Sequence, residues 1–389
     1  MEDILTGMVL TQDLPLNDAL VGDLSNRPGS LRGSIPVGHS MATEELLDEG
    51  RRAIYWERDG KIEFGGVLWS VNRGLGNRNL ELQVEGWLGY WDHRDVWRDR
   101  QFTATDQFEI FQTLVEDAQD EAYSTALGGP GADSDLGITV TWDALSGVLR
   151  DRTEDYRDYQ AKNLGEALRQ LAGLSDGFDY GMQYAVNLST QRIDKTIKLW
   201  HPRRGRDTGY LFEFDRGVST VLSPGVYEET YEETYGDEAR TIPRQGRSNI
   251  TRWGVARDAS KMAWRARGWG DGIQSARLRS EAITEARRGV YPPLDASFSF
   301  SGVTEQSTLD EHTAADLSRV DQPNRLPQVE VNPALFPKWG DWEMGDTVRL
   351  RIDDGYGSVG LDAPLEVRIV GWSVAPRSDR PVLTFEEIT

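Results

Sequence analysis

The sequence lacks cysteine altogether, which excludes disulfide bonds and thiolate metal sites. It has only four histidines, His39, His93, His201 and His312, and no His-Glu-x-x-His motif joins any of them into a metal-binding pair. No run approaches the roughly 18 to 20 apolar residues of a transmembrane helix, so we expect no membrane span. The first residues form neither a basic nor an apolar segment, so we expect no secretory signal.

The chain has fewer basic than acidic residues: 43 Lys and Arg against 64 Asp and Glu, which gives a net charge of −21. Such a chain does not suit wrapping a nucleic-acid backbone, although nucleic acid can slide past an acidic surface without sticking. The 389 residues are too many for one core, and 38% hydrophobic with 28% charged residues is typical of a folded protein. We therefore expect two to four folded domains.

Residues 53–91 predict three antiparallel strands in a meander. Asp59-Gly60 separates the apolar runs 53–58 and 61–71, and this dipeptide favours a type I′ turn because both of its residues accept a positive φ. Residues 80–91 read as the third strand, in which leucine and valine alternate with polar residues. Glycines inside these runs indicate bends, and a bent meander is how a small barrel begins to close.

Residues 101–205 predict an α+β module. A helix beginning at Asp106 carries an apolar stripe. The stripe consists of Phe108, Phe111, Val115, Ala118 and Ala122. A short strand is expected at 138–142, and a second helix, which begins at Asn163, is followed by a hairpin over 178–199.

Strand periodicity returns at 210–222, and the rest of the chain predicts further strands and a helix over 305–320. The closing strands are expected at 347–352, 365–374 and 382–385. The fold class predicted is mainly β, with two β-barrel domains and an inserted α+β module. Residues 1–100 with 206–245 would form the first barrel, 101–205 the module, and 246–389 the second barrel with its helix.

His93, in Asp92-His93-Arg94-Asp95, is the best candidate for an acid or base. No serine nucleophile context surrounds it, so a polar strand end explains this cluster better than a catalytic site does. Asp133-Ser134-Asp135 could bind Ca²⁺, but the glycine and glutamate positions of a calcium loop are missing and a solvated loop is the simpler interpretation. We therefore expect no catalytic residue, no metal and no cofactor.

Tryptophan supplies the candidate interface residues, since it is enriched both in cores and at interfaces. These candidates are Trp69, Trp87, Trp91, Trp97, Trp269 and Trp372. The cluster of Trp87, Trp91 and Trp97 could also stack sugars, although a core or interface role explains it better. The sequence alone does not distinguish which of these rings fill a core and which meet a partner.

The order of these parts resembles the phage tail hub proteins: the trimeric baseplate hub of contractile phages and the related minor tail proteins of siphophages that infect actinobacteria. Four short stretches carry the resemblance, which covers most of the chain. They are 64–71 (Phe-Gly-Gly-Val-Leu-Trp-Ser-Val), 80–90 (Leu-Glu-Leu-Gln-Val-Glu-Gly-Trp-Leu-Gly-Tyr), 163–168 with 177–180 (Asn-Leu-Gly-Glu-Ala-Leu and Gly-Phe-Asp-Tyr), and 345–348 (Gly-Asp-Thr-Val).

The resemblance implies a structural, non-enzymatic protein of the virion tail tip, assembled in the host cytoplasm. Three copies would form a ring in which two tail-tube-like barrels per chain present six similar units to a sixfold tube. The implied partners are the distal tail or tail tube protein, the tape measure protein, and central tip or fibre proteins. DNA would pass through the lumen without sequence-specific contacts. We do not expect the fused cell-wall hydrolase domain that some members carry.

Two other interpretations remain open at this stage. The tryptophan clusters and His93 would also fit a glycan-binding or cell-wall-degrading tail protein. A β-rich scaffold outside phages, such as the base of an injection-system spike, would share the trimer arrangement, and genomic neighbours would distinguish it from a phage tail.

Overall fold

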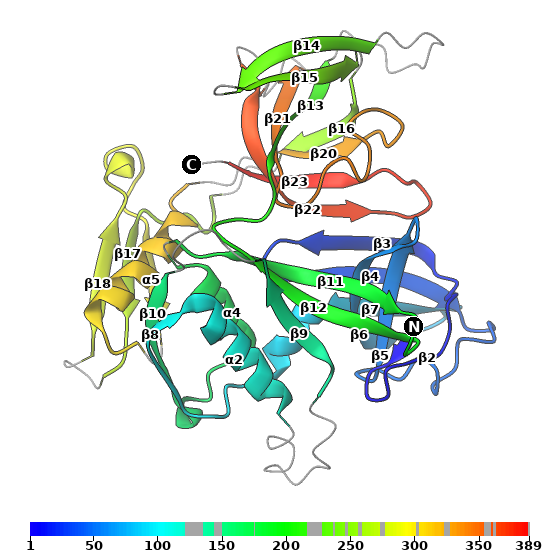
Figure 1. The fold of residues 1–389 in the computed structure, drawn as a ribbon, viewed down its shortest axis with the longest axis horizontal. Coiled ribbons are helices and arrows are strands. Elements are labelled where there is room, and N and C mark those ends of the chain that lie inside the picture. Colours follow the sequence, from blue (N-terminus) through cyan, green and yellow to red (C-terminus); the bar gives the residue numbers. More distant parts are fainter. Residues whose placement is uncertain are drawn as a thin grey trace. The chain divides into compact units, whose positions relative to one another are not determined.

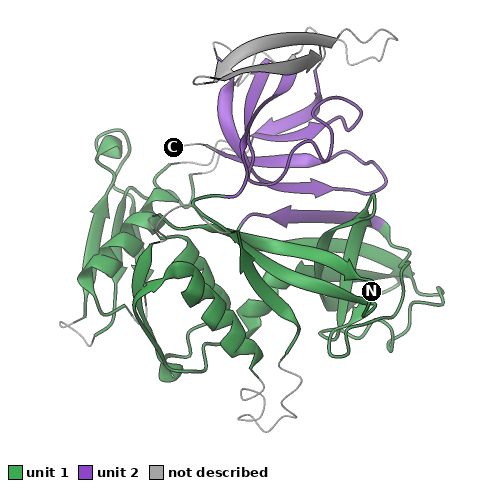
Figure 2. Cartoon of the chain, viewed as in Figure 1, with its two compact units in different colours: residues 1–17, 26–203, 257–324 green, residues 18–25, 204–256, 325–389 purple. Residues whose placement is uncertain are grey.

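The computed structural model describes residues 1–120, 135–143, 150–174, 176–215, 228–235, 238–245, 248–255, 259–272, 277–300, 303–322, 327–353, 359–360 and 363–387. Strands far outweigh helices, which confirms the predicted mainly β fold. The chain divides into two compact units, coloured separately in Figure 2. Unit 1 contains Met1–Asn17, Asn26–Arg203 and Arg257–Asn324, and unit 2 contains Asp18–Ser25, Arg204–Ala256 and Arg325–Thr389.

The main sheet of unit 1 is antiparallel and contains the predicted meander (Figure 1). In spatial order its strands are β4 (Arg27–Pro36), β7 (Asn79–Gly86), β6 (Lys61–Asn72), β5 (Arg52–Arg58), β1 (Glu2–Asp3) and β2 (Met8–Val9). The turn between β5 and β6 has positive φ at both Asp59 (52°) and Gly60 (80°), as the Asp-Gly dipeptide predicts. The hairpin prediction is therefore confirmed at its turn.

The third strand of the meander is shorter than predicted. It ends at Gly86, and the chain continues as α1 (Trp87–Tyr90) and the 3₁₀-helix η1 (Trp91–His93). Gly86 lies so close to the backbone of Gly29 that a side chain there would collide with it. The turn into α1 places Trp87 and Trp91 on the inside, where both are almost fully buried. Burial of two indole rings thus overrides the strand periodicity of 80–91.

The α+β module has the predicted helices. The helix α2 (Gln107–Gln119) begins at the N-cap Asp106, which accepts a hydrogen bond from the backbone N–H of Phe108 at 2.7 Å. The helix α4 (Leu164–Ala172) is capped in the same way by Asn163. The strands beside these helices are β8 (Arg100–Asp106), β9 (Ile138–Trp142), β10 (Asp151–Tyr156), β11 (Asp179–Asn187) and β12 (Arg192–Trp200), and η2 (Asp158–Gln160) lies between β10 and α4.

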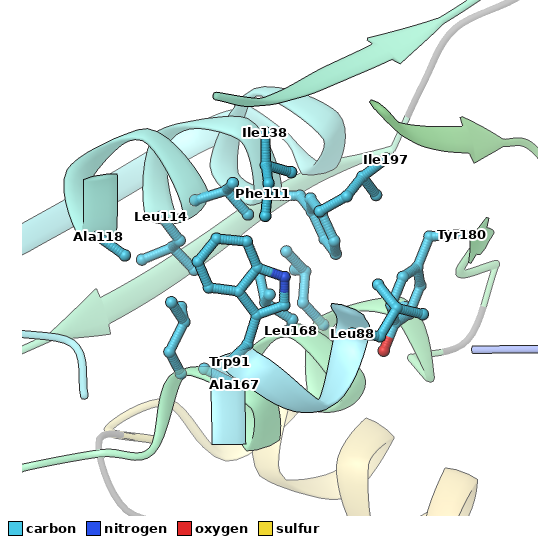
Figure 3. Close-up of a cluster of buried hydrophobic side chains, with 14 of the residues drawn as sticks. Leu88, Trp91, Phe111, Leu114, Ala118, Ile138, Ala167, Leu168, Tyr180 and Ile197 are labelled. Atoms are coloured by element: carbon cyan, nitrogen blue, oxygen red, sulfur yellow. The ribbon is translucent and has the colours of Figure 1, made fainter. Parts of the chain in front are cut away.

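One aromatic core joins these helices and strands to the end of the main sheet. Trp91 lies at its centre, with Phe111 and Leu114 of α2 and Leu168 of α4 around it (Figure 3). The predicted stripe of α2 faces this core, since Phe108, Phe111, Val115 and Ala118 are at most 2% exposed. The fifth predicted stripe residue, Ala122, lies outside the described residues.

Unit 1 also contains a separate lobe, which we define as the described part of Arg257–Asn324. Its sheet has the order β18 (Arg279–Ile283), β17 (Arg265–Trp269), β19 (Asp295–Ser299), and its helix is α5 (Gln306–Ser318), with a short 3₁₀-helix η4 (Glu285–Arg287). The helix predicted over 305–320 is confirmed. The prediction placed this helix in a second β domain made of residues 246–389. In the structure it belongs to unit 1.

The strands of unit 2 follow a path that returns to its start. Their order is β16 (Ile250–Val255), β20 (Pro327–Val331), β23 (Val382–Glu387), β22 (Leu365–Val374), β21 (Thr347–Asp353) and β13 (Asp207–Asp215). Asn249, directly before β16, accepts a hydrogen bond from the N–H of Glu213 and donates one to the carbonyl of Leu211, both at 2.8 Å. Side-chain bonds thus connect β16 back to β13.

Two further features complete unit 2. The strand β3 (Asn17–Leu24) pairs with the last residues of β22, beyond an irregularity between Ile369 and Gly371. The strands β14 (Glu228–Tyr235) and β15 (Glu238–Gln245) pair as a two-stranded ribbon. The prediction grouped 206–245 with the first hundred residues, whereas β13 pairs in parallel with β21. Whether the units correspond to two barrel domains with an inserted module remains a prediction.

Candidate functional site

Three of the six candidate interface tryptophans lie inside the folded chain. Trp87 and Trp91 are 0% and 1% exposed in the core of unit 1, and Trp372 is 7% exposed in unit 2. Trp372 packs edge to face against Trp339, with ring centroids 4.9 Å apart, and Trp339 packs against Trp342. An indole enclosed in this way has almost no surface left for a partner, so the interface prediction is corrected for these three residues, which stabilise the core instead.

The other three candidates keep part of their surface exposed, and their interface role remains a prediction. Trp69 on β6 lies against the exposed His93, with ring centroids 4.2 Å apart. Trp97 donates its indole N–H to the carbonyl of Asp117 at 2.8 Å and lies under the guanidinium of Arg98. Trp269 belongs to the lobe. Trp69 and Trp97 are therefore half-exposed aromatic side chains, and Trp69 contacts the segment η1 through His93.

The charged neighbours of His93 stabilise the module. Asp92 accepts two hydrogen bonds from Arg169 of α4, at 2.7 and 3.1 Å, and Arg94 donates one to the carbonyl of Ala118 at the end of α2. These bonds tie η1 to both helices. In the described part of the chain, the surroundings of His93 therefore correspond to a structural junction with one exposed imidazole that lies tilted against Trp69.

The predicted calcium loop lies only partly within the described residues. Asp133 falls outside them, and the Asp135 carboxylate accepts a hydrogen bond from the N–H of Gly137 at 2.8 Å, which is a common turn contact. Among the described residues, no group of three or more His, Asp or Glu side chains could hold a metal ion. In the same residues, no helix is long and apolar enough to cross a lipid bilayer.

A partly buried cluster of charged side chains lies where α5 of the lobe meets β10, and the sequence did not reveal it. We call this set the charged cluster. It consists of Arg150, Arg152, Glu154, Lys162, Glu311 and His312. Glu311 pairs with Arg150 at 2.8 Å and with Arg152 at 3.1 Å, and His312 Nε2 lies 4.0 Å from a Glu154 oxygen. The Lys162 ammonium lies over the Tyr156 ring, 5.2 Å from its centre.

Burial shifts the pKa values of this cluster strongly. It raises the pKa of the Glu154 carboxyl to about 7, although the positive charges of Lys162 and Arg152 oppose the rise. It lowers the pKa of the His312 imidazole to about 3, assisted by the same two cations and Arg319. Burial also lowers the pKa of the Lys162 ammonium. Near neutral pH His312 is therefore uncharged, stacked on Phe300 with ring centroids 5.0 Å apart.

Shifted titratable groups often mark active sites, but this cluster shows no catalytic arrangement. Its ion pairs join α5 to the start of β10, and the paired residues are 161 and 159 positions apart in the sequence. No local spacing could have found it, because neither partner segment carries a motif.

Comparison with known proteins gives a likeness at the level of fold. No protein-family model matches the chain, and no curated protein matches its sequence. Among solved structures, it is similar to the 43 kDa tail protein of prophage MuSo2 from Shewanella oneidensis, with a TM-score of 0.55, 9% identity, and coverage of 96% of this chain and 94% of the other. It is also similar to the tail protein from Neisseria meningitidis MC58, with a TM-score of 0.54, 12% identity, and coverage of 96% and 93%. The chain thus has the fold of these tail proteins along almost its whole length.

Proposed function

We propose that this chain is a structural, non-enzymatic component of a phage tail. The observation that carries the proposal is the end-to-end likeness to two tail proteins, in which one fold covers more than nine tenths of each chain. A likeness restricted to one unit would support only a shared domain, whereas this one includes both units. The tail role agrees with the resemblance found in the sequence motifs.

Within the tail, we place the chain at the tip or baseplate, as a hub of three copies. Each unit contains a path of six strands in its described residues, β4 to β2 in unit 1 and β16 to β13 in unit 2. Two β units per chain would let a trimer present six units to a sixfold tube without a second kind of interface. The net charge of −21 supports a lumen that repels the phosphates of passing DNA.

The partners in this proposal are the distal tail or tail tube protein, the tape measure protein, and central tip or fibre proteins. The half-exposed Trp69 and Trp97 are the side chains that we expect at a contact between proteins. The protein would reach the virion tail tip after assembly in the cytoplasm of the host. It would need no cofactor.

The oligomeric state tests the hub. Native mass spectrometry of the purified full chain should show a particle of about 131 kDa, three times the 43.7 kDa chain. Added tail tube protein should shift this particle to a larger complex. A chain that stays monomeric at high concentration and in the presence of the tube would contradict the hub, while leaving a more peripheral tail role standing.

A second candidate function is binding or degradation of the bacterial cell wall, favoured by the exposed His93 that lies against the Trp69 ring. Incubation with purified cell walls, followed by turbidity and pull-down measurements, separates the two. The structural role predicts no lysis and no retention on the walls, for the wild type and for His93→Ala alike. Lysis that disappears in His93→Ala would favour the enzyme.

A further inference from the structure

The lobe has the properties of an independent folding unit. Its core contains Phe300, Val303 and Leu309, with Leu278 and Phe298 packed against them. In the described part of the chain, the large core around Trp91 is built from residues between Ile4 and Leu199 and includes none from the lobe. The helix α5 packs on β17 and β18, closely enough that a side chain at Gly268 would collide with Thr313. The lobe therefore buries its own apolar face.

The lobe is inserted in the sequence between two strands that pair with each other. It begins after β16 and ends before β20, and these two strands pair with each other in unit 2. Both ends of the lobe thus continue into one strand pair. The lobe can change its position as a body without breaking a hydrogen bond of either strand.

Polar contacts join the lobe to the α+β module (α5, β17 and β18 are labelled beside β10 in Figure 1). The charged cluster supplies the ion pairs of Glu311 with Arg150 and Arg152 and the approach of His312 to Glu154. At the margins, Gln160 donates to Asp271 at 3.3 Å, and Arg319 donates to the carbonyl of Gly173 at 3.4 Å. These contacts link α5 and the end of β17 to β10, η2 and α4.

Buried charges make such an interface easy to open. Removing an ion pair from water costs nearly as much as the pairing returns, so a buried ion pair contributes little net stability. On separation, each charged side chain regains its hydration, and each apolar core stays closed. Interfaces of this polar kind between parts of one chain usually permit relative motion. An apolar interface would resist separation over its whole area.

We propose that the lobe detaches from the α+β module as a body, and that the charged cluster is the latch that opens. In the docked position Arg152, Glu154, Lys162 and His312 are buried, whereas the side chains of Arg150 and Glu311 are 35% and 34% exposed. In the released position α5 and β10 present charged faces to solvent. Glu154 interacts with Arg152 and Tyr156 of its own strand, with Lys162, and with Glu311 and His312 of α5, while Glu166 and Asp271 act on Lys162, Asp176 on Arg152 and Arg319 on His312. The proposal concerns the fold itself and goes beyond the tail role.

The absence of native cysteine permits a direct distance measurement in the full chain. Thr103→Cys on β8 and Ala314→Cys on α5 are both exposed positions, and spin labels at them would report the separation of module and lobe by pulsed electron resonance. The wild type should show a major short distance and a minor long one. Glu311→Gln, which removes both ion pairs with the arginines, should raise the long population about tenfold or more.

Asp295→Asn is the matched control. It breaks the bidentate pair of Arg265 and Asp295, both of which belong to the lobe, and it should leave the distances between lobe and module unchanged. Should Glu311→Gln fail to fold, Arg150→Gln removes the half-exposed arm of the same ion pair and should raise the long population by a smaller factor. A single short distance in the wild type that neither Glu311→Gln nor Arg150→Gln changes would overturn the proposal. An equal shift in the control would also overturn it.

Discussion

The two ways in which unit 1 joins its parts differ in chemistry. Around Trp91, helices and strands of the α+β module meet through aromatic and aliphatic side chains (Figure 3). Where the lobe meets the same module, the buried side chains are Arg152, Glu154, Lys162 and His312. Apolar contact is non-directional and stabilises the folded state in proportion to the area buried. Buried charges stabilise it only when they are paired. The first kind of contact fixes elements permanently, and the second permits a choice between two positions.

The apolar side of this comparison predicts the largest effect. Trp91→Ala removes an indole that is 1% exposed and should lower the free energy of unfolding of unit 1 by about 3–5 kcal/mol. Denaturation in guanidinium chloride, followed by near-ultraviolet circular dichroism, measures it. Leu188→Ala, at a side chain that is 86% exposed, should stay within about 0.5 kcal/mol of the wild type. Equal losses in both variants would show that Trp91 is not part of a packed core.

His312→Gln tests how docking of the lobe through the charged cluster depends on pH. Glu154 then remains as the group with a raised pKa, so its contribution is fully present below pH 4.5 and is lost as the pH rises through about 7. Docking of the lobe should weaken by about 3 kcal/mol between these values, since one pKa unit is 1.36 kcal/mol. The spin-label distances, recorded as a function of pH, give the docked fraction.

Glu154→Gln should show the opposite slope. His312 has a lowered pKa, so its contribution is fully present above pH 6.5 and is lost as the pH falls toward about 3. Docking should weaken by about 3 kcal/mol between pH 6.5 and 4.5, since one pKa unit is 1.36 kcal/mol. In the wild type the two slopes oppose each other, so its docked fraction should vary less over this range than in either variant. Slopes of the same sign in both variants would refute the assignment of these groups.

Unit 2 extends the comparison, because the polar side chains of Ser248 and Asn249 connect its first and last strands. Asn249→Ala removes the hydrogen bonds of this side chain to the N–H of Glu213 and to the carbonyls of Leu211 and Phe336, all of which are partly buried. It should destabilise unit 2 by about 2 kcal/mol. Hydrogen exchange of the backbone amides of β13 and β16 measures this loss. Asn332→Ala, which removes one exposed hydrogen bond from the N–H of Ala334, is the control and should change the exchange much less.

The smallest effect is expected for an ion pair in solvent. Arg265→Gln breaks the pair with Asp295 on the lobe surface, where water screens both charges. The denaturation midpoint should not move beyond experimental error, at low or high salt. A clear fall in the denaturation midpoint would mean that exposed ion pairs contribute more to the stability of this protein than we expect.

Local features of the fold were predictable because they depend on neighbouring residues. The Asp59-Gly60 turn and the caps Asp106 and Asn163 follow from backbone preferences within a few positions. The helix over 306–318 follows from the spacing of its apolar residues. The strand expected to reach Trp91 was wrong, because burial of Trp87 and Trp91 turns the chain at Gly86. Periodicity reports which faces are apolar, and it does not report what those faces will pack against.

The candidate site was less predictable than the fold. Tryptophan suits cores and interfaces equally, so the sequence could not separate the enclosed Trp372 from the half-exposed Trp69. The sequence by itself determined the mainly β character, the positions of α2, α4, α5 and the Asp59-Gly60 turn, and the acidic charge. Only the tertiary structure decided that β13 pairs with β21 and that Glu154 meets His312. Those contacts join segments more than a hundred residues apart, where the fit of whole surfaces decides the pairing and no local pattern records it.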